Sequence, residues 1–243
     1  MLTEQLLFFF LLLVAEVLGT IGGFGSSMLV MPLAGFFMPF EQALGLTALF
    51  HLFSNAAKML LFRSGVSWLL LLWLGTPAVV GVLIGAQATV FLDEQWLAVV
   101  LGFVLIALGT LLLIKHTWKL EATNANAVVG GTISGLLAGL AGTGGAVRGI
   151  TLAAFALEKS AFVSTSAWID MGVDLSRSVV YASHGFMTAE VLYYLPAMAV
   201  ASFGGSWVGK RALDRIPQDM FRRIVLGLVV VMGIITVWQG LAR

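Results

Sequence analysis

The sequence contains no cysteine and few charged residues. The absence of cysteine excludes disulfides, thiol catalysis and thiolate metal sites. Charged residues make up only 10% of the 243 residues, whereas 60% are hydrophobic, and the mean hydropathy is +1.02. A soluble domain cannot bury so much apolar surface. The composition therefore predicts an all-α integral membrane protein.

Enzyme signatures are also missing. The sequence contains no HExxH motif, no convergent set of Ser, His and Asp, and no cofactor fingerprint. We therefore expect no enzymatic activity, no cofactor and no metal site. The expected partners are the lipid bilayer and a small solute rather than a nucleic acid, and a homo-oligomer remains an open alternative.

Apolar segments cover most of the chain. They fall at about residues 5–37, 42–62, 66–91, 96–114, 127–157, 160–182, 188–209 and 221–241. The first and the fifth are too long for one upright helix, because a helix of roughly 30 residues would measure about 45 Å against a hydrocarbon core of about 30 Å. Each of these two segments contains a glycine-rich stretch, and we expect the helix to break there.

The two glycine-rich stretches read GGFGSSMLVMP at residues 22–32 and GTGGAVRG at residues 142–149. Backbone that leaves a helix at membrane depth must line a cavity or be covered by protein. Arg148 lies within the second stretch, where a guanidinium needs a partner. Two such breaks in corresponding places are the sequence pointer to a transporter built from repeats.

The two halves of the chain, residues 1–120 and 121–243, align at a constant offset of 119 residues. The offset relates Gly25 to Gly144, Lys58 to Arg177, and Pro77 to Pro196. Such self-similarity over nearly the whole chain is typical of an internal duplication. We therefore predict one membrane domain made of two repeats.

Loop charges predict that the two repeats are inverted. If each glycine-broken segment returns to its own side, as a re-entrant pair or a double crossing, each half crosses the membrane an odd number of times. One face then collects Arg63, Lys115, Lys119, Lys159, Lys210, Arg211, Arg215, Arg222 and Arg223, and the other keeps Arg243, Glu4, Glu41, Asp93 and Glu94. The positive-inside rule makes the first face cytoplasmic in the inner membrane and places both termini outside.

Polar residues at membrane depth form two stripes. Residues spaced i, i+4, i+7 lie on one face of a helix. One stripe with this spacing is His51, Asn55 and Lys58, and the other is Asp170, Asp174 and Arg177. The two stripes are equivalent at the repeat offset. In an inverted repeat they would converge on the glycine breaks about a pseudo-two-fold axis.

The chemistry of the breaks favours an anion. A helix that begins at such a break presents free N–H groups and the positive end of its dipole, and an arginine adds a fork of donors that matches a carboxylate, sulfonate or sulfite. The predicted substrate-binding residues are Arg148, Gly25, Ser26, Ser27, Thr143, Gly144, Gly145, Lys58, Arg177 and His51. Buried carboxylates can carry protons, and proton coupling is assigned to Asp170, Asp174 and Glu16.

Structural interpretations of the same residues stay open. Asp174 and Arg177 are spaced to form an i, i+3 pair that only neutralises itself in lipid. Lys58 lies close enough to a segment end to snorkel towards the interface. Arg148 is also placed to form a purely structural salt bridge with Asp170 or Asp174.

The chain resembles the TauE/SafE family of bacterial membrane proteins, often called sulfite exporters. The resemblance rests on the glycine-rich stretches at residues 22–32 and 141–149, and extends over the chain through its size, apolar segments and repeat. Ser26 and Ser27 interrupt the glycine run expected in the first half, and Thr151 stands in place of a proline in the second.

The resemblance implies movement of sulfite, sulfonates such as sulfoacetate, or related small anions across the inner membrane. Members of the family are assigned to both export and uptake. A secondary transporter, with proton coupling, is therefore the first hypothesis. An anion channel is the second, although it would leave the intramembrane aspartates without a purpose.

Overall fold

The computed structural model describes residues 2–22, 25–63, 65–114, 121–213, 215, 226–227, 230–231, 233–238 and 240–241. Within these ranges the chain forms helices and turns, with no β-strand. Several sequence predictions lie outside the described residues. They concern Gly23, much of the last apolar segment, and the loop charges Lys115, Lys119, Arg222, Arg223 and Arg243.

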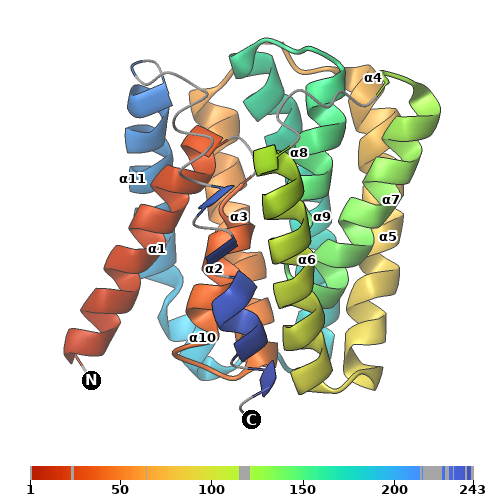
Figure 1. Ribbon diagram of the computed structural model, residues 1–243. Coiled ribbons are helices and arrows are strands. Elements are labelled where there is room, and N and C mark those ends of the chain that lie inside the picture. The colour runs from red at the N-terminus through yellow and green to blue at the C-terminus, as the bar shows by residue number, and fades with distance from the viewer. Residues whose placement is uncertain are drawn as a thin grey trace.

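The described elements form a single bundle of helices (Figure 1). In chain order they are α1 (Leu2–Gly22), α2 (Ser27–Ala34), α3 (Phe40–Leu61), α4 (Trp68–Leu70), the π-helix η1 (Leu71–Gly75), α5 (Thr76–Ala88), the 3-10 helix η2 (Thr89–Phe91), α6 (Glu94–Ile114), α7 (Asn124–Ala141), α8 (Gly145–Ala154), α9 (Lys159–Ser183), α10 (Ala189–Tyr193) and α11 (Leu195–Leu213). The ends marked N and C both lie at the lower edge of the bundle in Figure 1.

The outer surface of the bundle is apolar. Phe10 on α1, Ile84 on α5, Phe103 on α6 and Val200 on α11 all expose more than half of their surface, as expected of side chains that face lipid. Among the residues that the structure describes, three helical stretches are long and apolar enough to cross a membrane: Glu4–Ile21, Phe40–Leu61 and Trp68–Phe91. The prediction of a helical membrane protein is confirmed.

The helices are interrupted at both glycine-rich stretches. Gly25, between α1 and α2, has a φ of 81°, and Gly142, directly after α7, has a φ of 71°. Glycine adopts these left-handed conformations without the steric cost that a side chain imposes. The chain therefore reverses inside the bundle, and the short helices α2 and α8 begin there.

Close helix pairs flank the centre of the bundle. On one side Gly205 of α11 packs against the side chain of Glu16 on α1, and on the other Gly135 of α7 lies on the backbone of Ala78 in α5. Small residues allow this close approach of helix backbones in lipid. Between the pairs, α3 packs against α9, and this central contact carries the buried polar residues.

Candidate functional site

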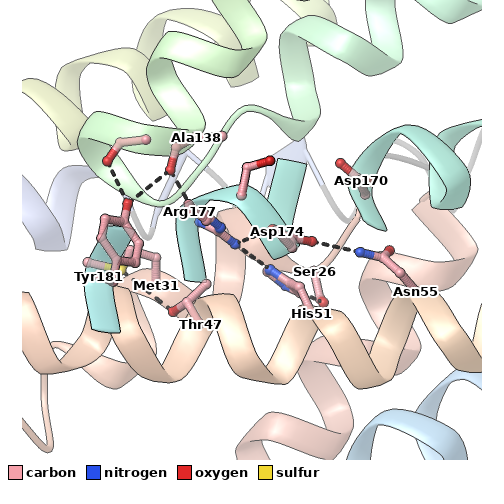
Figure 2. Close-up of polar contacts among 12 residues, drawn as sticks. Ser26, Met31, Thr47, His51, Asn55, Ala138, Asp170, Asp174, Arg177 and Tyr181 are labelled. Carbon is pink, nitrogen blue, oxygen red and sulfur yellow. Dashed lines mark hydrogen bonds and ion pairs between the residues drawn. The ribbon is translucent and has the colours of Figure 1, made fainter. Parts of the chain in front are cut away.

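The two polar stripes face each other across the contact between α3 and α9 (Figure 2). Nδ2 of Asn55 donates a hydrogen bond to Oδ2 of Asp174 over 2.6 Å, and Nη2 of Arg177 lies 3.1 Å from Nδ1 of His51. Residues that come earlier on α3 meet residues that come later on α9, so the two helices run antiparallel. The structure thus brings these four residues together.

Arg177 ties α9 to the end of α7. Its Nη2 pairs with Oδ1 of Asp174 over 2.6 Å, and its Nη1 donates to the carbonyl of Ala138 over 3.2 Å. One turn further, the hydroxyl of Tyr181 donates to the carbonyl of Gly139 over 2.5 Å. The last carbonyls of a helix have no complete set of partners within it. Arg177 and Tyr181 therefore supply side-chain donors where α7 ends.

A second cluster surrounds Glu16 on α1. Its carboxylate pairs with Nζ of Lys58 over 2.9 Å and accepts hydrogen bonds from the hydroxyls of Ser26, Ser54 and Ser206, at 2.6 to 2.7 Å. These partners come from the start of α2, from α3 and from α11. Glu16 is completely buried and Lys58 is 6% exposed. Lys58 is therefore bound inside the bundle and does not snorkel to the interface.

His51 connects the two clusters. Its Nδ1 faces the guanidinium of Arg177, and its Nε2 lies 3.1 Å from Oγ of Ser26. Because a guanidinium only donates, Nδ1 must accept, and the ring hydrogen is assigned to Nε2. His51 then donates to Ser26, whose hydroxyl donates to Glu16. A directed hydrogen-bond chain thus runs from Arg177 to Glu16.

Arg148 on α8 forms the third ion pair. Its Nη1 pairs with Oδ1 of Asp170, and its Nε donates to Oγ of Ser166 over 3.0 Å. Gly25 lies beside the guanidinium, since a Cβ added to this glycine would approach Nη2 to 3.6 Å. Arg148 is 3% exposed. It therefore lies between the two glycine breaks, and the salt bridge with Asp170 that the sequence left open is formed.

A small cavity of about 20 Å³, enough for roughly one water molecule, lies among these groups. The predicted residues that line it are Gly25, Ser27, His51, Lys58, Gly144, Gly145, Arg148, Asp170, Asp174 and Arg177. Three predicted residues lie outside its wall: Ser26 and Glu16 belong to the hydrogen-bonded cluster on α1, and Thr143 is buried at the break. Among the described residues, no three His, Asp or Glu side chains are grouped to hold a metal ion.

Both short helices begin at the cavity wall. Ser27 is the first residue of α2 and Gly145 the first of α8, and neither helix has a side-chain cap at its start. The hydroxyl of Ser26, in the capping position of α2, is directed to Glu16 instead. The N–H groups of the first helical turn have no partners within the helix. The site therefore combines N-terminal helix ends with a guanidinium, which suits an anion.

The ion pairs also have hydroxyl partners that were not predicted from the sequence. Ser54 lies one turn before Lys58 in the same stripe, so the i, i+4 pattern could have found it. Ser166 lies four residues before Asp170, which extends the stripe of α9 in the same way. Ser206 carries no such signal, because its contact with Glu16 depends on how α11 packs against α1.

Comparison with known proteins gives one match to a family. The family model described as Sulfite exporter TauE/SafE matches residues 7–236. The matched region contains both glycine-rich stretches and every residue of the cavity wall. No curated protein and no solved structure matches the chain significantly.

Proposed function

Because the chain belongs to the sulfite exporter TauE/SafE family, we propose that it is a secondary transporter of small sulfur-containing anions, coupled to protons. The substrates proposed are sulfite, sulfoacetate or other organosulfonates. The observation that carries this proposal is the position of Arg148, buried between the two helix breaks and on the wall of the central cavity.

The donors around the cavity fit the shape of such anions. Sulfite and the sulfonate group present three oxygens on one sulfur atom, so they can accept from several directions at once. A guanidinium offers two parallel N–H donors, and the starts of α2 and α8 offer backbone N–H groups from the sides. The absence of a side chain at Gly25, where an added Cβ would approach only Nη2 of Arg148, lets a ligand approach the backbone. At Gly144 the same absence makes room for the backbone carbonyl of Ser134 on α7.

The acidic residues favour a carrier over an anion channel. Asp170 and Asp174 line the same cavity as Arg148, and a carboxylate in a continuous pore would repel a permeating anion. In a carrier, the same residues can take up protons. An anion flux that does not depend on the proton gradient would favour the channel hypothesis instead.

We further propose that residues 1–120 and 121–243 are inverted repeats. At the offset of 119, α7 corresponds to α1 and α11 to α5, and the contacts of α1 with α11 and of α5 with α7 are then equivalent. Asn55 and Asp174, which the offset aligns, contact each other, as residues near a two-fold axis would. The N and C ends at one edge of Figure 1 fit this arrangement, with that edge outside.

The absence of native cysteine makes the orientation easy to test. We expect Asp93→Cys to react with a membrane-impermeant maleimide in intact cells, and Arg63→Cys to react only after lysis. Both side chains are exposed, and the loop charges predict that they lie on opposite faces of the membrane. The reverse pattern would place the termini in the cytoplasm.

Transport itself is tested with purified protein in proteoliposomes. We expect uptake of sulfite or isethionate along an imposed proton gradient, and its loss in Arg148→Met. The matched control is Arg63→Met, because Arg63 is an exposed arginine whose Nε donates only to the carbonyl of Leu60. Full activity of Arg148→Met, or no flux of any sulfur anion in the wild type, would contradict the proposal.

A further inference from the structure

The charges at the centre of the bundle balance in this conformation. Three buried ion pairs link the helices: Lys58 with Glu16, Arg148 with Asp170, and Arg177 with Asp174. A substrate anion that entered the cavity would add an uncompensated charge in a low-dielectric environment, which is strongly unfavourable. Substrate binding therefore requires that one carboxylate lose its charge.

The three carboxylates differ in how many contacts each would lose on leaving its cation. Glu16 also accepts hydrogen bonds from serine hydroxyls, and Asp174 also accepts from Asn55. Within the described part of the chain, Asp170 has only Arg148 as a partner. The Asp170 side chain is 14% exposed, against 6% for Asp174 and 0% for Glu16. Releasing Asp170 from its cation disrupts the fewest contacts.

Arg148 is also the cation best prepared to exchange partners. Its Nε remains bound to Ser166 when Asp170 leaves, so the two terminal NH2 groups keep their position. Lys58 and Arg177, by contrast, join helices. Lys58 links α3 to Glu16 of α1, and Arg177 links α9 to the carbonyl of Ala138 on α7. Arg148 therefore stays anchored to α9 while its terminal NH2 groups exchange one anion for another.

On the basis of the proposed function, we infer that Asp170 occupies the substrate's place on Arg148 while the site is empty. The anion binds there when Asp170 takes up a proton. The anion then pairs with the guanidinium while Asp170 becomes a neutral carboxylic acid. The total charge of the centre is unchanged, and one proton accompanies each monoanion. Glu16 and Asp174 stay ion-paired throughout, so the proton is carried by Asp170 alone.

The surroundings of Asp170 set how tightly it holds that proton. The charged groups that face it are Arg148 from α8, Lys58 from α3, and Asp174 and Arg177 from its own helix, and His51 of α3 lines the same cavity. When an anion neutralises Arg148, Asp170 loses its nearest cation and binds a proton more readily. Anion binding and protonation therefore support each other.

The test uses isethionate, because its sulfonate keeps a single negative charge over the whole pH range of the experiment. We expect the affinity of the wild-type protein to rise as the pH falls, by up to about tenfold per pH unit, because one proton binds with each anion. Asp170→Asn should bind isethionate with an affinity that does not vary with pH and that exceeds the wild-type affinity at alkaline pH. Asp93→Asn, a change at an exposed loop carboxylate, should retain the wild-type profile.

A second measurement needs no variant. When isethionate is added to wild-type protein in weakly buffered solution at alkaline pH, a pH-indicator dye should report the uptake of about one proton per anion bound. Binding without proton uptake and without pH dependence would overturn the inference while leaving the transporter assignment intact. If neither isethionate nor sulfite binds at any pH, the proposed function itself fails.

Discussion

Replacing Glu16 by glutamine should destabilise the protein strongly, because the Lys58 ammonium would then be buried without a counter-charge. Glu16 is fully buried on α1 and is the ion-pair partner of Lys58, 2.9 Å away. Its carboxylate also accepts hydrogen bonds from α2, α3 and α11. A glutamine fits the same space but has one acceptor oxygen, and its NH2 group would face hydroxyls that now donate.

The expected loss of folding stability is large for a single conservative substitution. Removal of one partner from a buried ion pair costs about 3–5 kcal/mol, and a misdirected hydrogen bond adds about 1 kcal/mol. At roughly 2–4 °C per kcal/mol for a chain of this length, the midpoint of thermal unfolding should fall by roughly 8–24 °C. The double variant Glu16→Gln with Lys58→Met removes both charges and should recover at least about 2 kcal/mol, because an apolar replacement of a buried pair is often neutral.

Thermal unfolding of the detergent-purified variants, followed by size-exclusion chromatography after heating, measures this difference. Glu190→Gln is the matched control, since Glu190 is an exposed carboxylate and its change should shift stability by no more than about 0.5 kcal/mol. The reasoning is refuted if Glu16→Gln unfolds within 2 °C of the wild type, or if the double variant is as unstable as the single one.

Three further tests, two of them with a matched control substitution, examine contacts inside the bundle by the same assay. Gly142→Ala should lower the free energy of unfolding more than Gly185→Ala. Both glycines have a positive φ, in which alanine costs about 1–2 kcal/mol, but only at position 142 would the added Cβ also press against Met31. Gly135→Ala should reduce the folded, monodisperse fraction sharply because its Cβ would collide with the backbone of α5, whereas Gly204→Ala meets nothing closer than 4.0 Å and should be tolerated. Tyr181→Phe should lose about 1 kcal/mol with its hydrogen bond to α7, and equal stability would show that this bond is dispensable.

Much of the architecture follows from patterns that a sequence displays directly. Apolar length identifies the membrane helices, and glycine clusters indicate where α1 and α7 end, because backbone that turns at membrane depth needs residues without side chains. The i, i+4, i+7 spacing places Asp170, Asp174 and Arg177 on one face of α9. These are local properties, so they need no knowledge of the packing.

Other features could not be predicted because they depend on contacts between distant segments. The apolar segment at residues 66–91 looks like one regular helix, but it contains a π-helical turn at Leu71–Gly75. The last residue of this turn, Gly75, packs against Ile169 of α9. The pair of Asp174 and Arg177 follows from i, i+3 spacing, but the partners of Lys58 and Arg148 are tertiary properties. Spacing along the chain does not show that Lys58 pairs with Glu16 rather than with an aspartate of α9.

The distribution of charge over the proposed repeats explains why a symmetric scaffold would hold one substrate. At the offset of 119, Arg148 aligns with Leu29 and Asp170 aligns with His51. His51 cannot replace the carboxylate, because its two nitrogens are already engaged with Arg177 and Ser26. The first half therefore lacks both members of the exchangeable pair. Its own break is tied instead to Glu16 through Ser26. One glycine break is thus held by the ion pair of Glu16 and Lys58, whereas the other carries Arg148, the cation on which we propose that the anion binds.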